Sequence, residues 1–110
     1  MKLPNGDRAV VALEKLTNYC LSPEHPRGRH KARVFATALG LTSENASQLR
    51  HALLNAALIY EAVEAEQDEY GQRYVLDFVM IGPVGQSTVR STWIIRAEED
   101  FPRFVTCFVL

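Results

Sequence analysis

The sequence contains 110 residues, of which 47% are hydrophobic, so one domain spanning residues 1–110 can bury a core without cross-links. The formal net charge of -1 excludes a protein that binds nucleic acid through bulk positive charge, and any such binding requires a local patch. No apolar run approaches the roughly 18 residues that span a bilayer, and no signal-type segment begins the chain, which predicts a cytoplasmic protein.

The first half of the chain is predicted to be helical. A turn signal at residues 4–7 indicates a small hairpin or an extended lead-in. Apolar residues at helical spacing predict a short helix over residues 12–21. After a loop that holds two prolines and a glycine, a second helix is expected from Arg29 to Gly40, which suits a left-handed C-cap. A third helix follows, capped by Thr42 or Ser43.

The second half changes to the period-two pattern of strands. Strands are expected over residues 59–66, 73–81 and 103–109, and another returns from the turn at residues 82–85. The sequence therefore predicts an α+β fold in which about three N-terminal helices pack on one face of a four-stranded antiparallel sheet.

The turn at residues 82–85 also predicts the register of the two strands that it joins. Tyr74 is then expected opposite Trp93 on an apolar face, and Asp77 opposite Arg90 on the other face. The last strand is apolar on both faces, so it is expected at the centre of the sheet or at a covered edge.

Cys20 and Cys107, the two cysteines, lie at opposite ends of the chain and outside any metal-ligand or redox spacing. Both are interpreted as small buried hydrophobic residues in a reducing compartment. Metal-ligand pairs of histidine or cysteine and glycine-rich nucleotide loops are missing, so the sequence predicts neither a metal nor a cofactor.

The segment 25–33 concentrates positive charge in an otherwise slightly acidic chain. A glycine beside a helix start exposes backbone N–H groups, and the helix dipole adds partial positive charge, so phosphate is the expected ligand. The alternative is a solvated basic helix start that binds nothing. The segment holds two histidines, no acid and four permanent cations: Arg27, Arg29, Lys31 and Arg33.

Helical geometry separates the residues of this segment. Lys31 lies about 90° from the centre of the apolar stripe, which places its ammonium group at the helix–sheet boundary, whereas His30 points away. A surface lysine that merely packs its stem is the alternative. His25, held between Glu24 and Pro26 in the loop, suits proton transfer; capping a carbonyl or lying on the surface is the competing interpretation.

On the sheet, Arg90, Thr92 and Arg96 share one face by alternation and form a candidate binding surface. Tyr70 and Tyr74 flank Gly71, where aromatic rings can stack on nucleic-acid bases; packing in the core or at an edge is the alternative.

Several motifs are distributed along nearly the whole chain: the run from Leu16 to Pro26, Gly28, Lys31-Ala32-x-x-Phe35, Leu39-Gly40, Tyr70-Gly71-x-x-Tyr74 and Thr92-Trp93. Through these motifs the sequence resembles an uncharacterised bacterial family of about this length. Members occur as stand-alone proteins and as C-terminal domains of polymorphic toxins, and their order of elements is similar to metal-independent ribonucleases of the barnase, colicin and RelE kind. That resemblance implies His25, Lys31 and Thr92 as active-site residues. Cys20 stands where leucine is expected.

The first hypothesis is therefore a metal-independent endoribonuclease-like toxin domain. His25 would take the proton from an RNA 2′-hydroxyl, which attacks the adjacent phosphate. Lys31, with Arg27 or Arg29, would stabilise the developing charge, and Thr92 would orient the phosphate.

Two alternatives stay open at this point. The first is a non-catalytic module that binds a nucleic acid or an acidic protein through the basic loop 25–33. The second is a small interaction or immunity protein whose sheet edge docks a partner. The expected partners are accordingly RNA and a small antitoxin or immunity protein.

Overall fold

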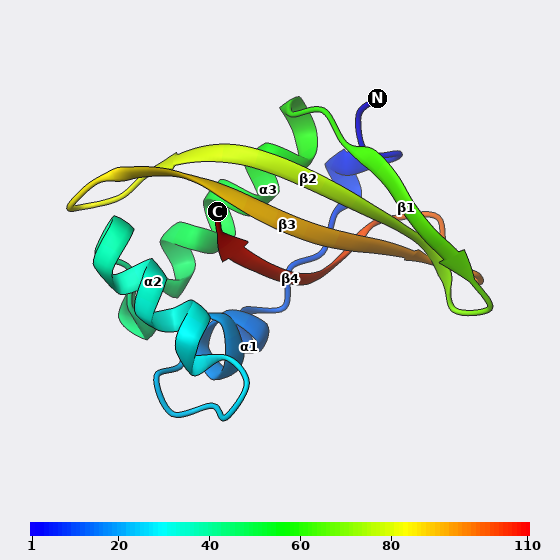
Figure 1. Ribbon diagram of the computed structural model, residues 1–110. Helices are drawn as coiled ribbons and strands as arrows, with labels where there is room; N and C mark the ends of the chain where they lie inside the picture. Colours follow the sequence, from blue (N-terminus) through cyan, green and yellow to red (C-terminus); the bar gives the residue numbers. More distant parts are fainter.

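A four-stranded antiparallel sheet forms the second half of the computed structural model, which describes residues 1–110. Its strands neighbour one another in chain order, from β1 to β4 (Figure 1). Their bounds are Val63–Asp68 for β1, Gly71–Ile81 for β2, Gln86–Arg96 for β3 and Arg103–Val109 for β4. The predicted fold class, helices on one face of a four-stranded antiparallel sheet, is confirmed.

The predicted register of β2 and β3 is confirmed. Tyr74 lies opposite Trp93, and Asp77 opposite Arg90, because the short turn between Gly82 and Gly85 leaves only one alignment of the strands. The first strand was predicted wrongly at its start. Backbone hydrogen bonding of the helical type continues as far as the Tyr60 N–H, which donates to the Ala56 carbonyl, so β1 begins only at Val63.

The helices of the first half follow the predicted order. Helix α1 (Leu13–Lys15) continues into η2 (Leu16–Cys20), a π-helical turn, so the expected short helix is present but is wider in its second part. Helix α2 (Arg29–Leu39) ends at Gly40, whose φ of 73° is the left-handed conformation that the sequence predicted. Helix α3 (Ala46–Ile59) is preceded by the 3-10 turn η3 (Ser43–Asn45), which the Thr42 side chain caps.

The lead-in segment forms no hairpin of its own. It contains the 3-10 turn η1 (Gly6–Arg8) and pairs with distant residues through two isolated bridges, Lys2 with Glu61 and Val10 with Arg103. Val10 thereby covers the first residues of β4, whose outer edge would otherwise offer free backbone groups there. Strand β4 therefore lies at an edge of the sheet and not at its centre, and Val10 covers the start of that edge.

The core lies between the helices and one face of the sheet. Helix α2 packs against β3 and β4, and α3 packs against β2 (Figure 1). Trp93 is fully buried, and its ring meets Phe104 edge to face with 5.6 Å between centroids. Its indole N–H donates to the Ser91 hydroxyl at 2.9 Å, and that hydroxyl donates to the Leu76 carbonyl at 2.7 Å. All polar groups of this network are therefore paired.

The opposite face of the sheet is not covered by any helix, and we call it the open face. Its side chains are half-buried by one another, in contrast with the buried residues that alternate with them. The central part of the open face on β2, β3 and β4 includes Val75, Asp77, Arg90, Thr92, Ile94, Thr106 and Phe108, and Arg96 and Arg103 lie at one end of it.

Candidate functional site

Lys31 lies on the flank of α2 that faces β4, as the helical geometry predicted. It is half-buried, and its Nζ atom lies 5.6 Å from the centroid of the Tyr19 ring and 5.4 Å from that of Phe108. Both distances are within the range of cation–π attraction. Lys31 has no carboxylate partner within ion-pair distance, so its positive charge is held between two aromatic rings and stays available to an anion.

His25 lies in the loop before α2, with its ring packed edge to face against Tyr19 at 4.7 Å between centroids. Its Nδ1 atom accepts two backbone N–H groups, from Arg27 at 3.0 Å and from Gly28 at 3.1 Å. An Nδ1 that accepts hydrogen bonds leaves the proton of the neutral ring on Nε2. In this arrangement His25 presents a hydrogen-bond donor outward, and service as a base requires that the loop hydrogen bonds be released first.

Tyr19 thus joins the two residues that the sequence singled out. We call His25, Lys31, Tyr19 and Phe108 the Tyr19 cluster. Tyr19 lies within the helix that the sequence predicted over residues 12–21, and Phe108 within the predicted last strand, and neither was a predicted site residue. No local signal could have found this pair, because positions 19 and 108 meet only when η2 packs against β4.

The candidates on the sheet lie beside this cluster. Arg90 is paired in register with Phe108, and its guanidinium donates to both Asp77 oxygens at 2.9 Å. These hydrogen bonds lower the pKa of Asp77 and raise that of Arg90. Thr92 is paired with Thr106, one strand away from the residues that touch Lys31. The structure therefore brings Arg90 and Thr92 to the open face next to the Tyr19 cluster, with Arg90 already engaged by an acid.

The remaining candidates are dispersed. Arg27 is exposed in the loop. Arg29 lies on the other flank of α2 from Lys31, where it lines a cavity of about 270 Å³ together with Arg33. Tyr74 is only 6% exposed and packs in the core opposite Trp93, so its side chain does not share the open face. Tyr74 therefore packs in the core, which was the alternative to base stacking.

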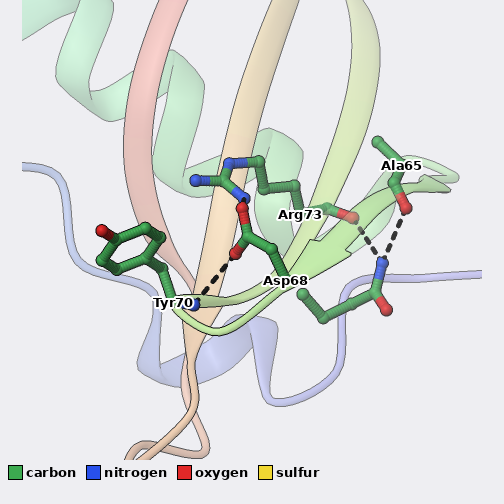
Figure 2. A network of polar contacts seen from close by, with 5 residues as sticks. Ala65, Asp68, Tyr70 and Arg73 are labelled. Carbon is green, nitrogen blue, oxygen red and sulfur yellow. Dashed lines mark hydrogen bonds and ion pairs between the residues drawn. The ribbon is translucent and has the colours of Figure 1, made fainter.

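Tyr70 occupies the tight turn between β1 and β2, and its side chain is 65% exposed. Its backbone N–H donates to Asp68 at 2.9 Å, and Asp68 also pairs with Arg73 at 2.8 Å (Figure 2). These hydrogen bonds lower the pKa of Asp68, the contact with Tyr70 most of all. Figure 2 shows the Tyr70 ring pointing away from this network, which fixes the turn and leaves the ring free to contact a ligand.

Cys20 and Cys107 come together although they lie at opposite ends of the chain. Both are fully buried and free, as the sequence predicted for small apolar residues, and the Cys20 sulfur lies 3.8 Å from the Thr106 hydroxyl. The Cys107 thiol donates to Cys20, which lowers the pKa of Cys20 and raises that of Cys107. The pair lies where η2 packs against β4, and its members neighbour Tyr19 and Phe108 in the sequence.

Gly28 is the residue that lets the His25 loop approach Tyr19. A Cβ atom at this position would lie 2.3 Å from the Tyr19 carbonyl oxygen, closer than any such contact tolerates. Gly28→Ala is therefore expected to push the loop away from η2 and to lower stability by about 1–3 kcal/mol. Thermal unfolding measures this as a decrease in Tm of roughly 5–15 °C.

Arg27→Ala is the matched control for Gly28→Ala, because Arg27 is exposed in the same loop and keeps its N–H for His25. It should melt like the wild type. The NMR signals of the His25 ring, which Tyr19 shields, should move in the glycine variant alone. Unchanged melting and unchanged His25 signals in Gly28→Ala would contradict the close packing of the loop.

No three His, Cys, Asp or Glu side chains gather closely enough to hold a metal ion. A bilayer-spanning helix is also absent, since each helix is too short or too polar for that role.

Comparisons with known proteins give a family and a fold. The model of a family described as "Domain of unknown function (DUF6883)" matches residues 2–110. No curated protein matches the sequence. The fold is similar to that of a chain in a solved structure, described as "Contact-dependent growth inhibition toxin - immunity protein complex from Klebsiella pneumoniae 342", with a TM-score of 0.71 and 20% sequence identity. The similarity covers 92% of this chain and 99% of that chain.

Proposed function

This chain belongs to the DUF6883 family, and we propose that it is a toxin-type domain that cleaves RNA phosphodiesters without a metal ion. The observation that carries the proposal is the Tyr19 cluster, in which His25 and Lys31 share one aromatic ring beside the open face. A proton-carrying ring and an unpaired cation at one place are the groups that transphosphorylation requires. The shared fold with a chain of a toxin–immunity complex supports the toxin-type role.

In the proposed reaction the RNA strand lies across the open face and one phosphate enters the Tyr19 cluster. The 2′-hydroxyl of the preceding nucleotide loses its proton and attacks this phosphate to form a 2′,3′-cyclic phosphate, while the bond from phosphorus to the 5′-oxygen of the next nucleotide breaks. The departing 5′-oxygen takes a proton from water, and Lys31 stabilises the negative charge that develops on the phosphate oxygens. Thr92 orients the phosphate, and Arg27, exposed in the loop, attracts the strand, whereas Arg29 faces the other flank of α2. Tyr70 offers a free ring for base stacking at the far end of the face.

His25 can act in this reaction either as a base or as a hydrogen-bond donor, and the activity of variants at position 25 distinguishes the two roles. As a base it takes the 2′-hydroxyl proton on Nε2, after the ring proton has moved to Nδ1. As a donor it holds a phosphate oxygen through its Nε2–H, and the loop hydrogen bonds stay intact. The hydrogen-bonded state of the loop supports the donor role.

The test is cleavage of total RNA by the purified protein in the presence of a metal chelator. Wild type is expected to cleave, and His25→Ala should lose roughly 100-fold in rate. Glutamine at position 25 keeps an N–H donor, so a donor role predicts that His25→Gln retains most activity, whereas a base role predicts that it fails like alanine. His51→Ala, an exposed histidine of α3, is the control. No cleavage by wild type under any such condition removes the proposal.

A non-catalytic interaction domain is the second candidate, and one observation favours it. Strand β1 is the uncovered edge of the sheet, and the segment 61–69 carries five acids and no base. Such an edge suits a basic partner protein, including the other member of a toxin–immunity pair. This candidate predicts a stable complex that charge reversal at Glu64 and Glu66 disrupts, together with no RNA cleavage.

A further inference from the structure

Three cations converge at the end of the open face that lies away from Lys31. Lys15, Arg96 and Arg103 line a pocket of about 180 Å³, whose other walls are apolar. No carboxylate lines it. We call it the basic pocket. Its three cations lie outside the segment 25–33, because they come from α1, the end of β3 and the start of β4.

Each cation is held in place by a different contact. The Lys15 ammonium donates to the Phe104 carbonyl at 3.0 Å. The Arg103 guanidinium forms a two-point ion pair with Glu99, with both distances 2.8 Å. Arg96 has no ion-pair partner within 4.0 Å. The pocket therefore combines two anchored donors with one guanidinium whose hydrogen-bonding groups are free.

The positive charges of the basic pocket are not fully compensated. Glu99 neutralises Arg103, while Glu69 and Glu98 line a separate hollow on the other side of Arg96. Burial, then the proximity of Arg96 and Arg103, lowers the pKa of Lys15. Cations that crowd one another around an empty space gain free energy when an anion enters, because it replaces repulsion by attraction.

We propose that the basic pocket binds a phosphate group of a single RNA strand, as a second phosphate subsite on the open face. This rests on the proposed function, in which the strand crosses that face. Phe104 of the pocket and Phe108 of the Tyr19 cluster are four residues apart on β4, or about 13 Å. One phosphate cannot span that distance, so the two places hold different phosphates of the same strand. The basic pocket positions the strand and takes no part in the chemical step.

The first arm of the test uses inorganic phosphate alone. Backbone NMR signals of residues around the pocket should shift as phosphate is added, and the pKa of Lys15, followed by NMR, should rise. Arg96→Gln should weaken this binding roughly tenfold, because it removes a charge-assisted contact. Arg33→Gln, another exposed arginine without an ion pair, lies on α2 outside the pocket and should change nothing. Absence of phosphate-dependent shifts at the pocket, or equal weakening by both variants, overturns the proposal.

The second arm uses a 2′-O-methyl oligoribonucleotide, which lacks the attacking hydroxyl and cannot be cleaved by this route. Removing one phosphate contact should reduce the slope of log affinity against log salt by about 0.7 in Arg96→Gln. If Arg96→Gln weakens binding of inorganic phosphate but not of the oligonucleotide, the pocket is a free-phosphate site and the RNA proposal is wrong. If wild type binds the oligonucleotide through Arg96 yet cleaves no RNA, the proposed catalysis fails while the subsite stands.

Discussion

Lys31→Ala is expected to abolish growth arrest in a bacterial host that expresses the domain, and to slow RNA cleavage by the purified protein by about 100-fold or more. The reason is that Lys31 supplies the unpaired positive charge of the Tyr19 cluster, held by Tyr19 and Phe108 where a phosphate of the bound strand would lie. Growth curves after induction measure the first effect, and cleavage of total RNA measures the second.

Two further variants separate a functional loss from an unfolded protein. Lys31 is half-buried, and cation–π contacts contribute about 0.5–2 kcal/mol each depending on exposure, so Lys31→Ala should remain folded with a modestly lower Tm. Arg33→Ala removes a cation from the opposite flank of α2 and should leave growth arrest intact. Lys31→Arg keeps a charge that stacks on aromatic rings and should restore part of the activity. Full growth arrest by Lys31→Ala would contradict the proposed role.

Trp93→Ala is expected to cost about 3–5 kcal/mol of unfolding free energy, a large share of the roughly 5–15 kcal/mol typical of a domain. Trp93 is fully buried, packs edge to face on Phe104, and donates its indole N–H to Ser91. Alanine leaves a cavity and removes one partner of the Ser91 hydroxyl. Chemical denaturation followed by circular dichroism measures the loss.

Ile94→Ala is the matched control, since Ile94 is the next residue and points to the open face, where it is only half-buried. A loss of less than about 1 kcal/mol is expected for this variant. Side chains alternate across a strand, so a register shifted by one residue would exchange the effects of the two substitutions. A larger loss for Ile94→Ala than for Trp93→Ala would therefore refute the register.

The sequence by itself determined the elements whose cause is local. Gly40, in the left-handed conformation, ends α2, and the turn between β2 and β3 sets the register of these strands. The end of the helix and the register both depend on residues that are close together in the chain. The angle between Lys31 and the apolar stripe of α2 likewise placed its ammonium at the boundary of the core. The start of β1 was misjudged, because an apolar run at the end of α3 suits a helix and a strand equally well.

The tertiary structure alone decided which side chains meet. Lys15 and Phe104 are separated by 89 positions, and Cys20 and Thr106 by 86, yet both pairs are in contact. The basic pocket and the Tyr19 cluster arise in the same way, where η2 and α2 pack against β4 and the Lys15 side chain of α1 reaches Phe104. Helical and strand periodicities repeat every two to four residues, so they indicate which face a side chain occupies. They carry no information about which distant face lies opposite, because that depends on how the whole core packs.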